Sequence, residues 1–199
     1  MRIAIITPAA ARSRSGNRNT ALRWAAMLRR LGHQVRVQVD WDGAPADLML
    51  ALHARRSHAS IRNFATACPN QPRVLVLTGT DLYRDIRTDA DAQESLRLAD
   101  RMVVLQDMGL EELTPELRAK TRVIYQSAKP GRRQPPLRNC FEVTVIGHLR
   151  EEKDPFRCAC ALKYLPAHSR IRVAQLGRAM SAEMERQALE ISTWGKNVY

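Results

Sequence analysis

Long apolar segments are missing from this 199-residue chain, so a membrane span is a poor interpretation of any part of it. The short apolar stretch at the start is interrupted by Pro8 and followed closely by arginines. A signal peptide needs a longer uninterrupted apolar core, so a first β-strand explains this stretch better. Hydrophobic residues make up 45% of the chain and charged residues 26%, a balance typical of a globular protein rather than a disordered one.

Cysteine is also scarce. The four cysteines, Cys68, Cys140, Cys158 and Cys160, are too few and too irregularly spaced for a disulfide framework. Cys158 and Cys160 would diverge on a helix and have no histidine nearby, so we interpret them as small buried hydrophobic residues rather than as metal ligands. We therefore expect reduced thiols, a cytoplasmic protein, and neither a metal nor a cofactor.

Acidic residues are absent from the first 39 positions, which carry eight arginines. Over the whole chain, 32 Lys and Arg against 20 Asp and Glu give a net charge of +12, which favours anionic partners. Aromatic residues make up only 5%, and the chain has no base-stacking pattern, zinc-finger spacing or recognition-helix signature. Phosphorylated small molecules are therefore a better interpretation than nucleic acid.

Short apolar runs alternate with helical segments along most of the chain. The runs predict strands at 2–7, 35–39, 48–52, 74–77, 102–105 and 123–125. Helical spacing or capping predicts a helix from about 20 to 31, one that ends at about 67, one that ends at about 100, and one over 110–117. Because most strands are separated by a helix, we expect an α/β fold with a parallel sheet and right-handed crossovers.

The first strand leads into a loop that contains Ser15 and Gly16. Asn19 or Thr20 is the expected N-cap of the following helix, and Gly32 the expected stop. A glycine-containing loop at a helix N-terminus presents backbone N–H groups to phosphate. The dinucleotide fingerprint G-x-G-x-x-G is absent, so a plain turn at Gly16 remains an alternative.

Polar side chains follow two of the predicted strands. His53 comes directly after the third strand, with Arg55 and Arg56 close behind it, and the run from Thr78 to Asp81 follows the fourth. The carboxyl edge of an open parallel sheet is where such folds bind ligands. A structural histidine at a strand end remains an alternative for His53.

A basic, proline-rich stretch over 129–136 predicts a linker, which gives domains 1–128 and 140–199 with 129–139 between them. Further strands are expected at 142–146 and 171–175, with helices over 158–164 and 182–190 and a tail from Trp194. We expect the run from Val143 to Gly147 to be buried on both faces. Two strands and two helices do not close a layered core, so we expect an incomplete second domain with an exposed sheet edge.

A cationic loop follows the first strand of the second domain. It carries His148, Arg150 and Lys153, and Asp154 with Pro155 is expected to open the next helix. Its position at a sheet edge and its charge indicate an anionic ligand. A solvated loop that is basic without binding anything remains an alternative.

The order of these features resembles the GT-B glycosyltransferases, in particular the retaining group that uses nucleotide-sugar donors. The motifs of that group are similar to Ser15-Gly16-Asn17, Leu52-His53-Ala54, Thr78-Gly79-Thr80-Asp81, Ala99-Asp100-Arg101-Met102 and Ile146-Gly147-His148-Leu149-Arg150-Glu151-Glu152-Lys153-Asp154. The resemblance covers nearly the whole chain. It implies a GT-B fold, with a Rossmann-like first domain and the beginning of a second Rossmann-like domain.

The sequence departs from the group at several points. Thr78 stands where histidine is usual, His148 stands where arginine is usual, and the later E-x(7)-E segment has no counterpart. Within the group, S-R-S-G-N-R-N-T-A, L-H-A-R-R-S and L-T-G-T-D-L-Y look most like the selenosugar synthases of selenoneine biosynthesis, which join a sugar to selenophosphate. The missing carboxylates lead us to expect that the chain as given does not turn over.

The resemblance implies sugar transfer from a nucleotide-sugar donor to a small anionic acceptor, with selenophosphate as the particular candidate, and a role for each cluster. His53 is the implied catalytic residue. The implied donor-binding residues are Gly16, His148, Arg150 and Lys153. The implied acceptor-binding residues are Arg12, Arg14, Arg18, Arg55, Arg56, Thr78, Thr80 and Asp81. The alternative is a non-catalytic basic module, or an inactive fragment, that binds nucleotides or nucleic acid.

Overall fold

A computed structural model describes residues 1–13, 15–128, 130–166 and 168–194. Arg14, Lys129 and the end of the expected tail, 195–199, lie outside the described residues. The chain divides into two units, Met1–Lys129 and Pro130–Tyr199. Within the described ranges, no helix is both long and apolar enough to cross a membrane.

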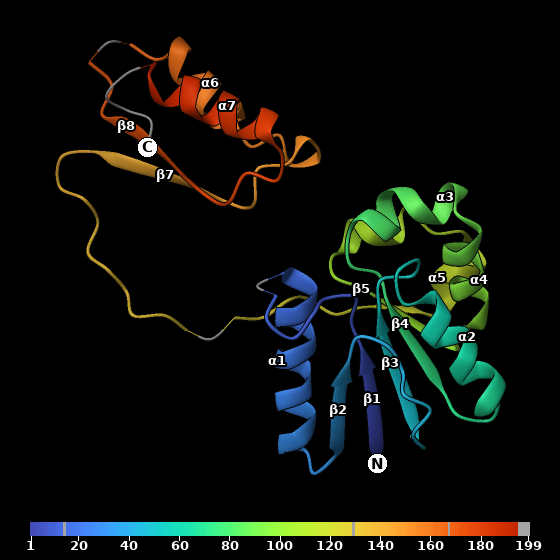
Figure 1. Ribbon diagram of the computed structural model, residues 1–199. Helices are drawn as coiled ribbons and strands as arrows, with labels where there is room; N and C mark the ends of the chain where they lie inside the picture. Colours follow the sequence, from blue (N-terminus) through green and yellow to red (C-terminus); the bar gives the residue numbers. More distant parts are fainter. Residues whose placement is uncertain (14, 129, 167, 195–199) are drawn as a thin grey trace. The chain divides into compact units, whose positions relative to one another are not determined.

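The first unit contains one six-stranded sheet in which every strand pair is parallel. Its strands are β1 (Arg2–Ile6), β2 (Gln34–Gln38), β3 (Leu48–Leu52), β4 (Arg73–Val76), β5 (Arg101–Val104) and β6 (Thr121–Val123). They lie in the order β2-β1-β3-β4-β5-β6 (Figure 1). The predicted parallel sheet is confirmed. The last strand lies two residues earlier than predicted, because Met102 pairs with Thr121 and Tyr125 instead hydrogen-bonds Asp107 through its hydroxyl.

Helices cover both faces of this sheet. They are α1 (Gly16–Arg30), α2 (His58–Ala67), the π-helical turn η1 (Asp81–Asp85), α3 (Ile86–Thr88), α4 (Ala90–Leu98), the 3₁₀ turn η2 (Asp107–Leu110) and α5 (Pro115–Ala119). The α1 side buries Ile3 and Ile5 with Trp24, and the opposite side buries Ile6 and Phe64. Alternate strand residues therefore serve two separate cores, as a sheet covered on both faces requires.

The N-terminus of α1 corrects one prediction. The N-cap is Ser15, whose Oγ accepts the Arg18 backbone N–H at 3.4 Å, rather than Asn19 or Thr20. Gly16 is therefore the first helical residue, and a Cβ at that position would meet no atom within 4 Å. Gly32 has a φ of +85° and follows the helix end, as predicted.

The prediction of a single helix over 110–117 is also wrong. Proline starts a helix well but cannot continue one from the preceding turn, since it lacks the N–H that would bond backwards. The chain accordingly makes η2, then a short break, and begins α5 at Pro115.

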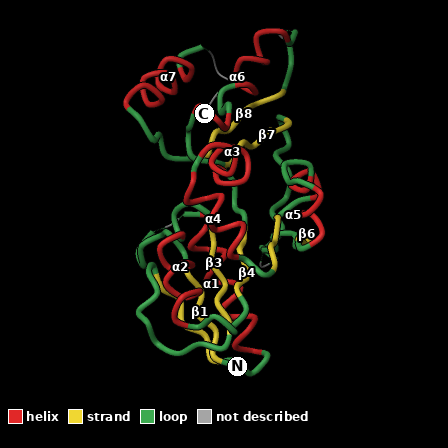
Figure 2. The backbone as a smooth tube through the Cα atoms, turned by 90° about the vertical axis from the view of Figure 1, so that its right-hand side faces the viewer, coloured by secondary structure: helices red, strands yellow, loops and turns green. Residues whose placement is uncertain are grey.

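The described residues of the second unit form two parallel strands and two main helices on the same side of them (Figures 1 and 2). The elements are β7 (Phe141–Ile146), the 3₁₀ turn η3 (Glu151–Lys153), α6 (Arg157–Ala161), the 3₁₀ turn η4 (Leu162–Tyr164), β8 (Ile171–Leu176) and α7 (Ala182–Ser192). Val173 is buried toward the helices, whereas Ile146 is 80% exposed. The expectation that β7 is buried on both faces is wrong, because the described helices lie on one side only. Cys160 is exposed rather than buried.

The helix after the cationic loop starts later than predicted. Asp154 has a φ of +43° and follows η3, and α6 begins at Arg157. Instead of capping backbone N–H groups, the Asp154 carboxylate pairs with the Arg157 side chain. Pro155 is buried beside Phe156, so it packs into the core of the second unit rather than opening the helix.

Candidate functional site

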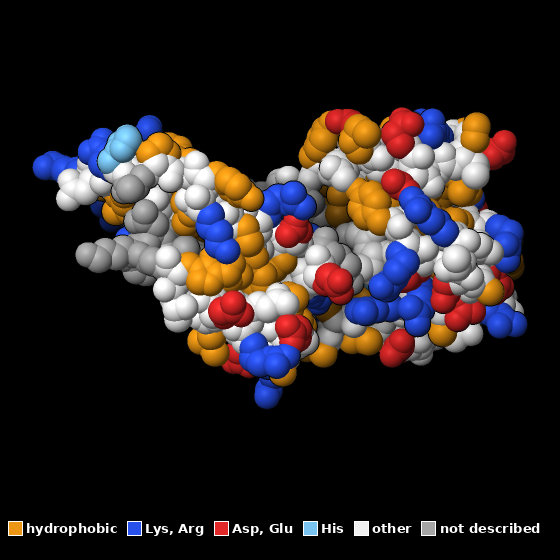
Figure 3. All heavy atoms as spheres, turned by 90° about the horizontal axis from the view of Figure 1, so that it is seen from above, with side chains coloured by type: hydrophobic (Ala, Val, Ile, Leu, Met, Phe, Trp, Pro, Cys, Tyr) orange, Lys and Arg blue, Asp and Glu red, His pale blue; other side chains and the backbone are white. Residues whose placement is uncertain are grey.

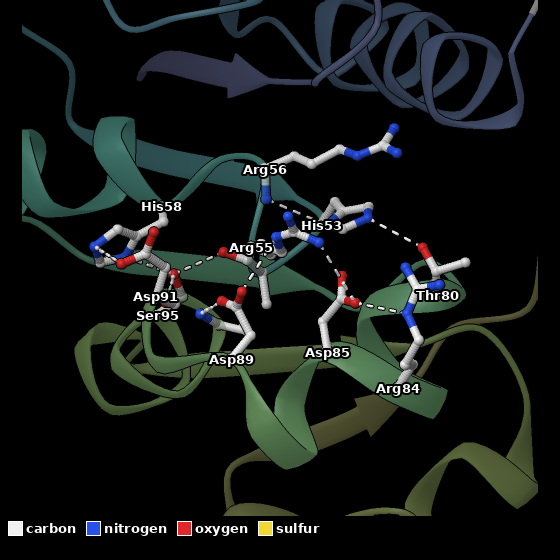
Figure 4. A network of polar contacts seen from close by, with 12 residues as sticks. His53, Arg55, Arg56, His58, Thr80, Arg84, Asp85, Asp89, Asp91 and Ser95 are labelled. Carbon is white, nitrogen blue, oxygen red and sulfur yellow. Dashed lines mark hydrogen bonds and ion pairs between the residues drawn. The ribbon is translucent and has the colours of Figure 1, made fainter.

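Polar residues from two neighbouring strand ends meet at the carboxyl edge of the first unit. Because β3 and β4 are adjacent and parallel, the segment after Leu52 lies beside the segment after Val76. We call His53, Thr78, Thr80 and Asp81 the edge site; Figure 4 shows His53 and Thr80 with the charged residues around them. The sheet order therefore brings together side chains that are 27 residues apart in the sequence.

His53 is the most constrained residue of the edge site. It is 3% exposed and has a φ of +78°, in the left-handed region that a bulky side chain rarely adopts. Its Nδ1 lies 3.3 Å from the Arg56 backbone N–H, and its Nε2 lies 3.3 Å from Thr80 Oγ1. Because Nδ1 accepts from a backbone donor, the ring proton of the neutral form is on Nε2, which donates to the threonine hydroxyl.

Burial lowers the pKa of His53 below its ordinary value of 6.5, since the charged form would lose its hydration. The carboxylate of Asp81 opposes this change, while the guanidinium of Arg56 adds to it. The result is a neutral imidazole at pH 7. Such a ring offers an N–H hydrogen bond without adding a positive charge to the edge.

Asp81 holds the two strand ends together. It is fully buried, and its carboxylate accepts backbone N–H groups from Ala54 at 3.0 Å, Thr78 at 3.0 Å and Gly79 at 2.8 Å. A carboxylate occupied in this way faces the protein rather than a ligand. The sequence resemblance implied that Asp81 binds an acceptor; in the structure its carboxylate accepts backbone N–H groups of both strand ends.

The two arginines after His53 differ in their surroundings (Figure 4). Arg55 pairs with Asp89 at 3.2 Å and with Asp85 at 3.9 Å, and Asp85 also contacts Arg84 at 3.0 Å. Arg56 forms no ion pair among the described residues, and its exposed side chain extends away from this cluster. The positive charge of Arg55 is therefore balanced by carboxylates, whereas that of Arg56 is exposed without a carboxylate partner among the described residues.

A hollow of about 310 Å³ lies at the same edge, on the α1 side of the sheet. It is lined by Gly16, Asn17, Asn19, Thr20, Arg23, Thr78, Leu105, Gln126 and Ser127. Arg23 donates to Ser127 Oγ at 2.7 Å, and Gln126 donates to Thr20 Oγ1 at 3.0 Å, which ties the segment after β6 to α1. The hollow thus adjoins Thr78 of the edge site.

Two side-chain atoms at this end of the sheet are buried without a hydrogen-bond partner among the described residues. They are Thr7 Oγ1, directly after β1, and Arg18 Nε, in the first turn of α1. An unsatisfied buried polar atom in a native fold calls for an explanation, and a ligand group is one. Sequence reasoning missed Thr7, although a polar residue at the end of an apolar run before Pro8 was a visible signal. Arg12 is exposed in the loop between β1 and α1.

A second histidine near the edge was also missed. His58 is buried at the start of α2, with Nδ1 3.1 Å from Ser95 Oγ and Nε2 3.3 Å from Glu94 and 3.5 Å from Asp91. Ser95 Oγ in turn donates to the Ala54 carbonyl at 2.7 Å. This network joins α2 and α4 behind the edge site, and a lone histidine in the sequence gave no sign of it.

In the second unit, the cationic loop follows β7. His148 Nδ1 accepts the Arg178 backbone N–H at 3.2 Å, and Arg150 and Lys153 are exposed at the two ends of η3. A Cβ at Gly177 would lie 1.8 Å from the Gly147 carbonyl oxygen, so the loops after β7 and β8 approach each other closely. Two exposed cations and an imidazole close to a sheet edge are suited to an anionic ligand.

Charge at the first unit's edge is mixed. In the view toward the carboxyl ends of its strands, Lys and Arg side chains lie next to Asp and Glu side chains (Figure 3). Among the described residues, no group of three or more His, Cys, Asp or Glu is arranged to hold a metal ion. Separately, the edge presents a neutral imidazole and exposed guanidinium groups.

The six-stranded parallel sheet and the second βαβ unit define a Rossmann-like α/β fold of the GT-B type. Among solved structures, the chain is similar to Anabaena Alr3699/HepE in complex with UDP and glucose, with a TM-score of 0.64 and 14% identity, over 100% of this chain and 68% of that one. It is also similar to the same protein in complex with UDP-glucose, with a TM-score of 0.62 and 15% identity over the same shares. At this identity the likeness shows the fold alone.

No family model and no curated protein matches the chain. The predicted GT-B fold is supported by the similar solved structures. Evidence for the donor, the acceptor and the roles of individual residues has to come from the geometry of the site.

Proposed function

We propose that this chain belongs to a nucleotide-sugar-dependent glycosyltransferase that transfers a sugar to a small anionic acceptor. The observation that carries the proposal is His53, a neutral, buried, left-handed histidine whose Nε2–H is directed at a hydroxyl at the sheet edge. The shared fold with structures that hold UDP, glucose and UDP-glucose supports a nucleotide-sugar donor. The four free cysteines support a reducing, cytoplasmic setting.

On the acceptor side, a ligand oxygen would replace Thr80 as the partner of His53 Nε2. Thr78, which lines the adjoining hollow, would supply a hydroxyl to an oxyanion there, and Arg56 and Arg18 would supply positive charge at the same end of the sheet. Arg12 would extend the cationic surface, while Arg55 would position its neighbours through Asp89. Positioning of this kind brings an acceptor to the anomeric carbon without covalent participation of the protein.

On the donor side, Lys153 and Arg150 would neutralise the negative charge that develops on the leaving diphosphate, and His148 would orient the loop. Such electrostatic stabilisation commonly contributes more than any other effect to the catalysis of transfer reactions. Gly16 would let backbone N–H groups at the start of α1 approach a phosphate. Selenophosphate is the particular acceptor that we propose within the class of small oxyanions.

Donor binding is tested by calorimetric titration of the full chain with UDP-glucose. Lys153→Ala should weaken binding roughly 10- to 100-fold, since it removes a charge-assisted phosphate contact. Arg170→Ala is the matched control, because Arg170 is an exposed cation of the same unit that lies outside the loop. Equal losses in both variants would remove the loop from the donor site. If the chain does not bind UDP-glucose but binds nucleic acid with a steep dependence on salt concentration, the whole proposal is refuted in favour of a nucleic-acid-binding module.

Because the chain as given is expected not to turn over, transfer is tested with a chain to which the E-x(7)-E segment of the group has been added. The measurement is the release of UDP from UDP-glucose in the presence of selenophosphate, of phosphate, or of neither. Selenophosphate-dependent release supports the particular acceptor, and equal release with phosphate supports the oxyanion class alone. His53→Ala should reduce release roughly 100-fold by loss of positioning. His33→Ala, at the opposite end of the sheet, should leave it unchanged. Full activity of His53→Ala would refute the assignment.

A further inference from the structure

The outward face of α1 is cationic and holds an apolar strip. The helix contains Arg18, Arg23, Arg29 and Arg30 and no acidic residue. Its opposite face buries Thr20, Ala21, Trp24 and Ala25 against the sheet. The outward face therefore has no negative charge of its own to offset the arginines.

A hollow of about 300 Å³ lies on this outward face. It is lined by Leu22, Arg23, Ala26, Met27 and Arg30, which we call the α1 outer face. Leu22 and Ala26 are four residues apart and form one row along the helix, with Leu22 42% exposed. Arg23 and Arg30 are seven residues apart and lie along the same flank of that row. The arrangement is a shallow apolar floor with guanidinium groups at its margin.

The arginines of α1 are held in defined places. Arg23 donates to Ser127 Oγ at 2.7 Å, and Arg29 donates to the Val35 carbonyl at 2.6 Å. Each guanidinium has five N–H donors, so both keep donors for an anion. Arg30 forms no ion pair among the described residues and extends the row of positive charge toward the C-terminal end of the helix.

We propose that the α1 outer face docks on an anionic lipid surface. Lipid phosphates match the arginines, and the boundary between headgroups and acyl chains matches the row of Leu22 and Ala26. Nucleic acid offers the same phosphates, but the only aromatic side chain of α1, Trp24, is buried and cannot stack on bases. An exposed apolar row gains nothing against a phosphate backbone, so the combination favours lipid.

The experiment is flotation of the full chain with vesicles of equal parts phosphatidylglycerol and phosphatidylcholine. The wild-type chain should float with these vesicles and remain unbound with pure phosphatidylcholine. Arg23→Gln/Arg30→Gln should lower the partition coefficient roughly 30-fold, the loss expected for two arginines at an anionic surface. Leu22→Gln should lower it roughly fivefold, through loss of apolar contact.

The matched control is Arg62→Gln/Arg97→Gln, which removes the same charge from exposed positions on α2 and α4. An equal loss in this control, or in Arg132→Gln/Arg133→Gln from the linker, would show that net charge alone causes binding and would overturn the proposal. Tighter binding to a duplex DNA than to vesicles, with no effect of Leu22→Gln, would also overturn it. The inference is independent of the proposed sugar transfer, because flotation requires neither donor nor acceptor.

Discussion

His53 combines a left-handed backbone, burial and hydrogen bonds at both ring nitrogens. A non-glycine residue in such a conformation costs about 1–3 kcal/mol and persists only where its surroundings hold it. Here Asp81 provides that hold, because its carboxylate binds the Ala54 N–H and two N–H groups of the β4 strand end. The strained histidine and the buried carboxylate are therefore two parts of one arrangement.

Replacing Asp81 tests this arrangement. Asp81→Asn keeps the shape but turns one acceptor oxygen into an N–H₂ donor that faces other donors. We expect a loss of about 3 kcal/mol in the free energy of unfolding, measured by urea denaturation followed by circular dichroism. Asp40→Asn, at an exposed position, should be neutral. If both variants unfold at the same urea concentration, the carboxylate does not hold the edge site.

The lowered pKa of His53 predicts a dependence of stability on pH. Between that lowered value and 6.5 the unfolded chain binds a proton at this residue and the folded chain does not, so the free energy of unfolding falls as pH falls through this window. Above 6.5 this contribution is constant. Urea denaturation at pH 7.5 and pH 5.5 should show a smaller decrease for His53→Gln than for the wild type. A decrease of the same size in both would contradict the assigned neutral state.

Among the secondary-structure elements, the eight described strands were all predicted from apolar runs, because a strand in a parallel sheet is read directly from its composition. The helix starts were harder to predict. Ser15, Asn19 and Thr20 are all residue types that cap helices, and the structure uses Ser15, the first of the three. Asp154 could cap or pair, and the neighbouring Arg157 made pairing available.

The edge site shows the same limit. Strand ends located His53 and Thr80 in the sequence, since both follow apolar runs. The roles of Asp81 and His58 could not be predicted, because they depend on backbone N–H groups and carboxylates that come together only through the strand order. Charge counts likewise drew attention to the arginines. They could not predict that Arg55 forms an ion pair, whereas Arg56 forms none among the described residues.

Gly177 provides a test of how the elements of the second unit are connected, and Gly16 of the first unit is its control. Gly177→Ala would place a Cβ 1.8 Å from a backbone oxygen, so the loops after β7 and β8 must separate. Gly16→Ala meets no atom within 4 Å and should leave stability unchanged or slightly raised. Amide NMR spectra should show lost dispersion in the second unit for Gly177→Ala alone. Native spectra for both variants would show that the close approach is not required.

Across the chain as a whole, the segment over 130–138 stands out because it has no helix or strand and is exposed throughout. It carries Arg132, Arg133 and Arg138 between two units that each have their own buried residues. Like charges and prolines disfavour packing of such a segment. The chain should therefore behave as two folding units joined by an accessible connection.

Brief digestion with trypsin tests this behaviour. First cuts are expected after Arg132, Arg133 or Arg138, and they should leave a resistant piece that contains the first unit. Mass spectrometry of the early fragments identifies the cut sites. First cuts within residues 73–105 would contradict the six-stranded sheet.

The pairing of β7 with β8 alone also determines which amides exchange with solvent. In the first unit, β1 and β3 have neighbours on both sides, so their amide hydrogens are released only when the sheet opens. Among the described residues, β7 and β8 have only each other, and a parallel pair uses alternate N–H groups of each strand. Deuterium should therefore enter every second amide of β7 and β8 quickly, while β1 and β3 stay protected.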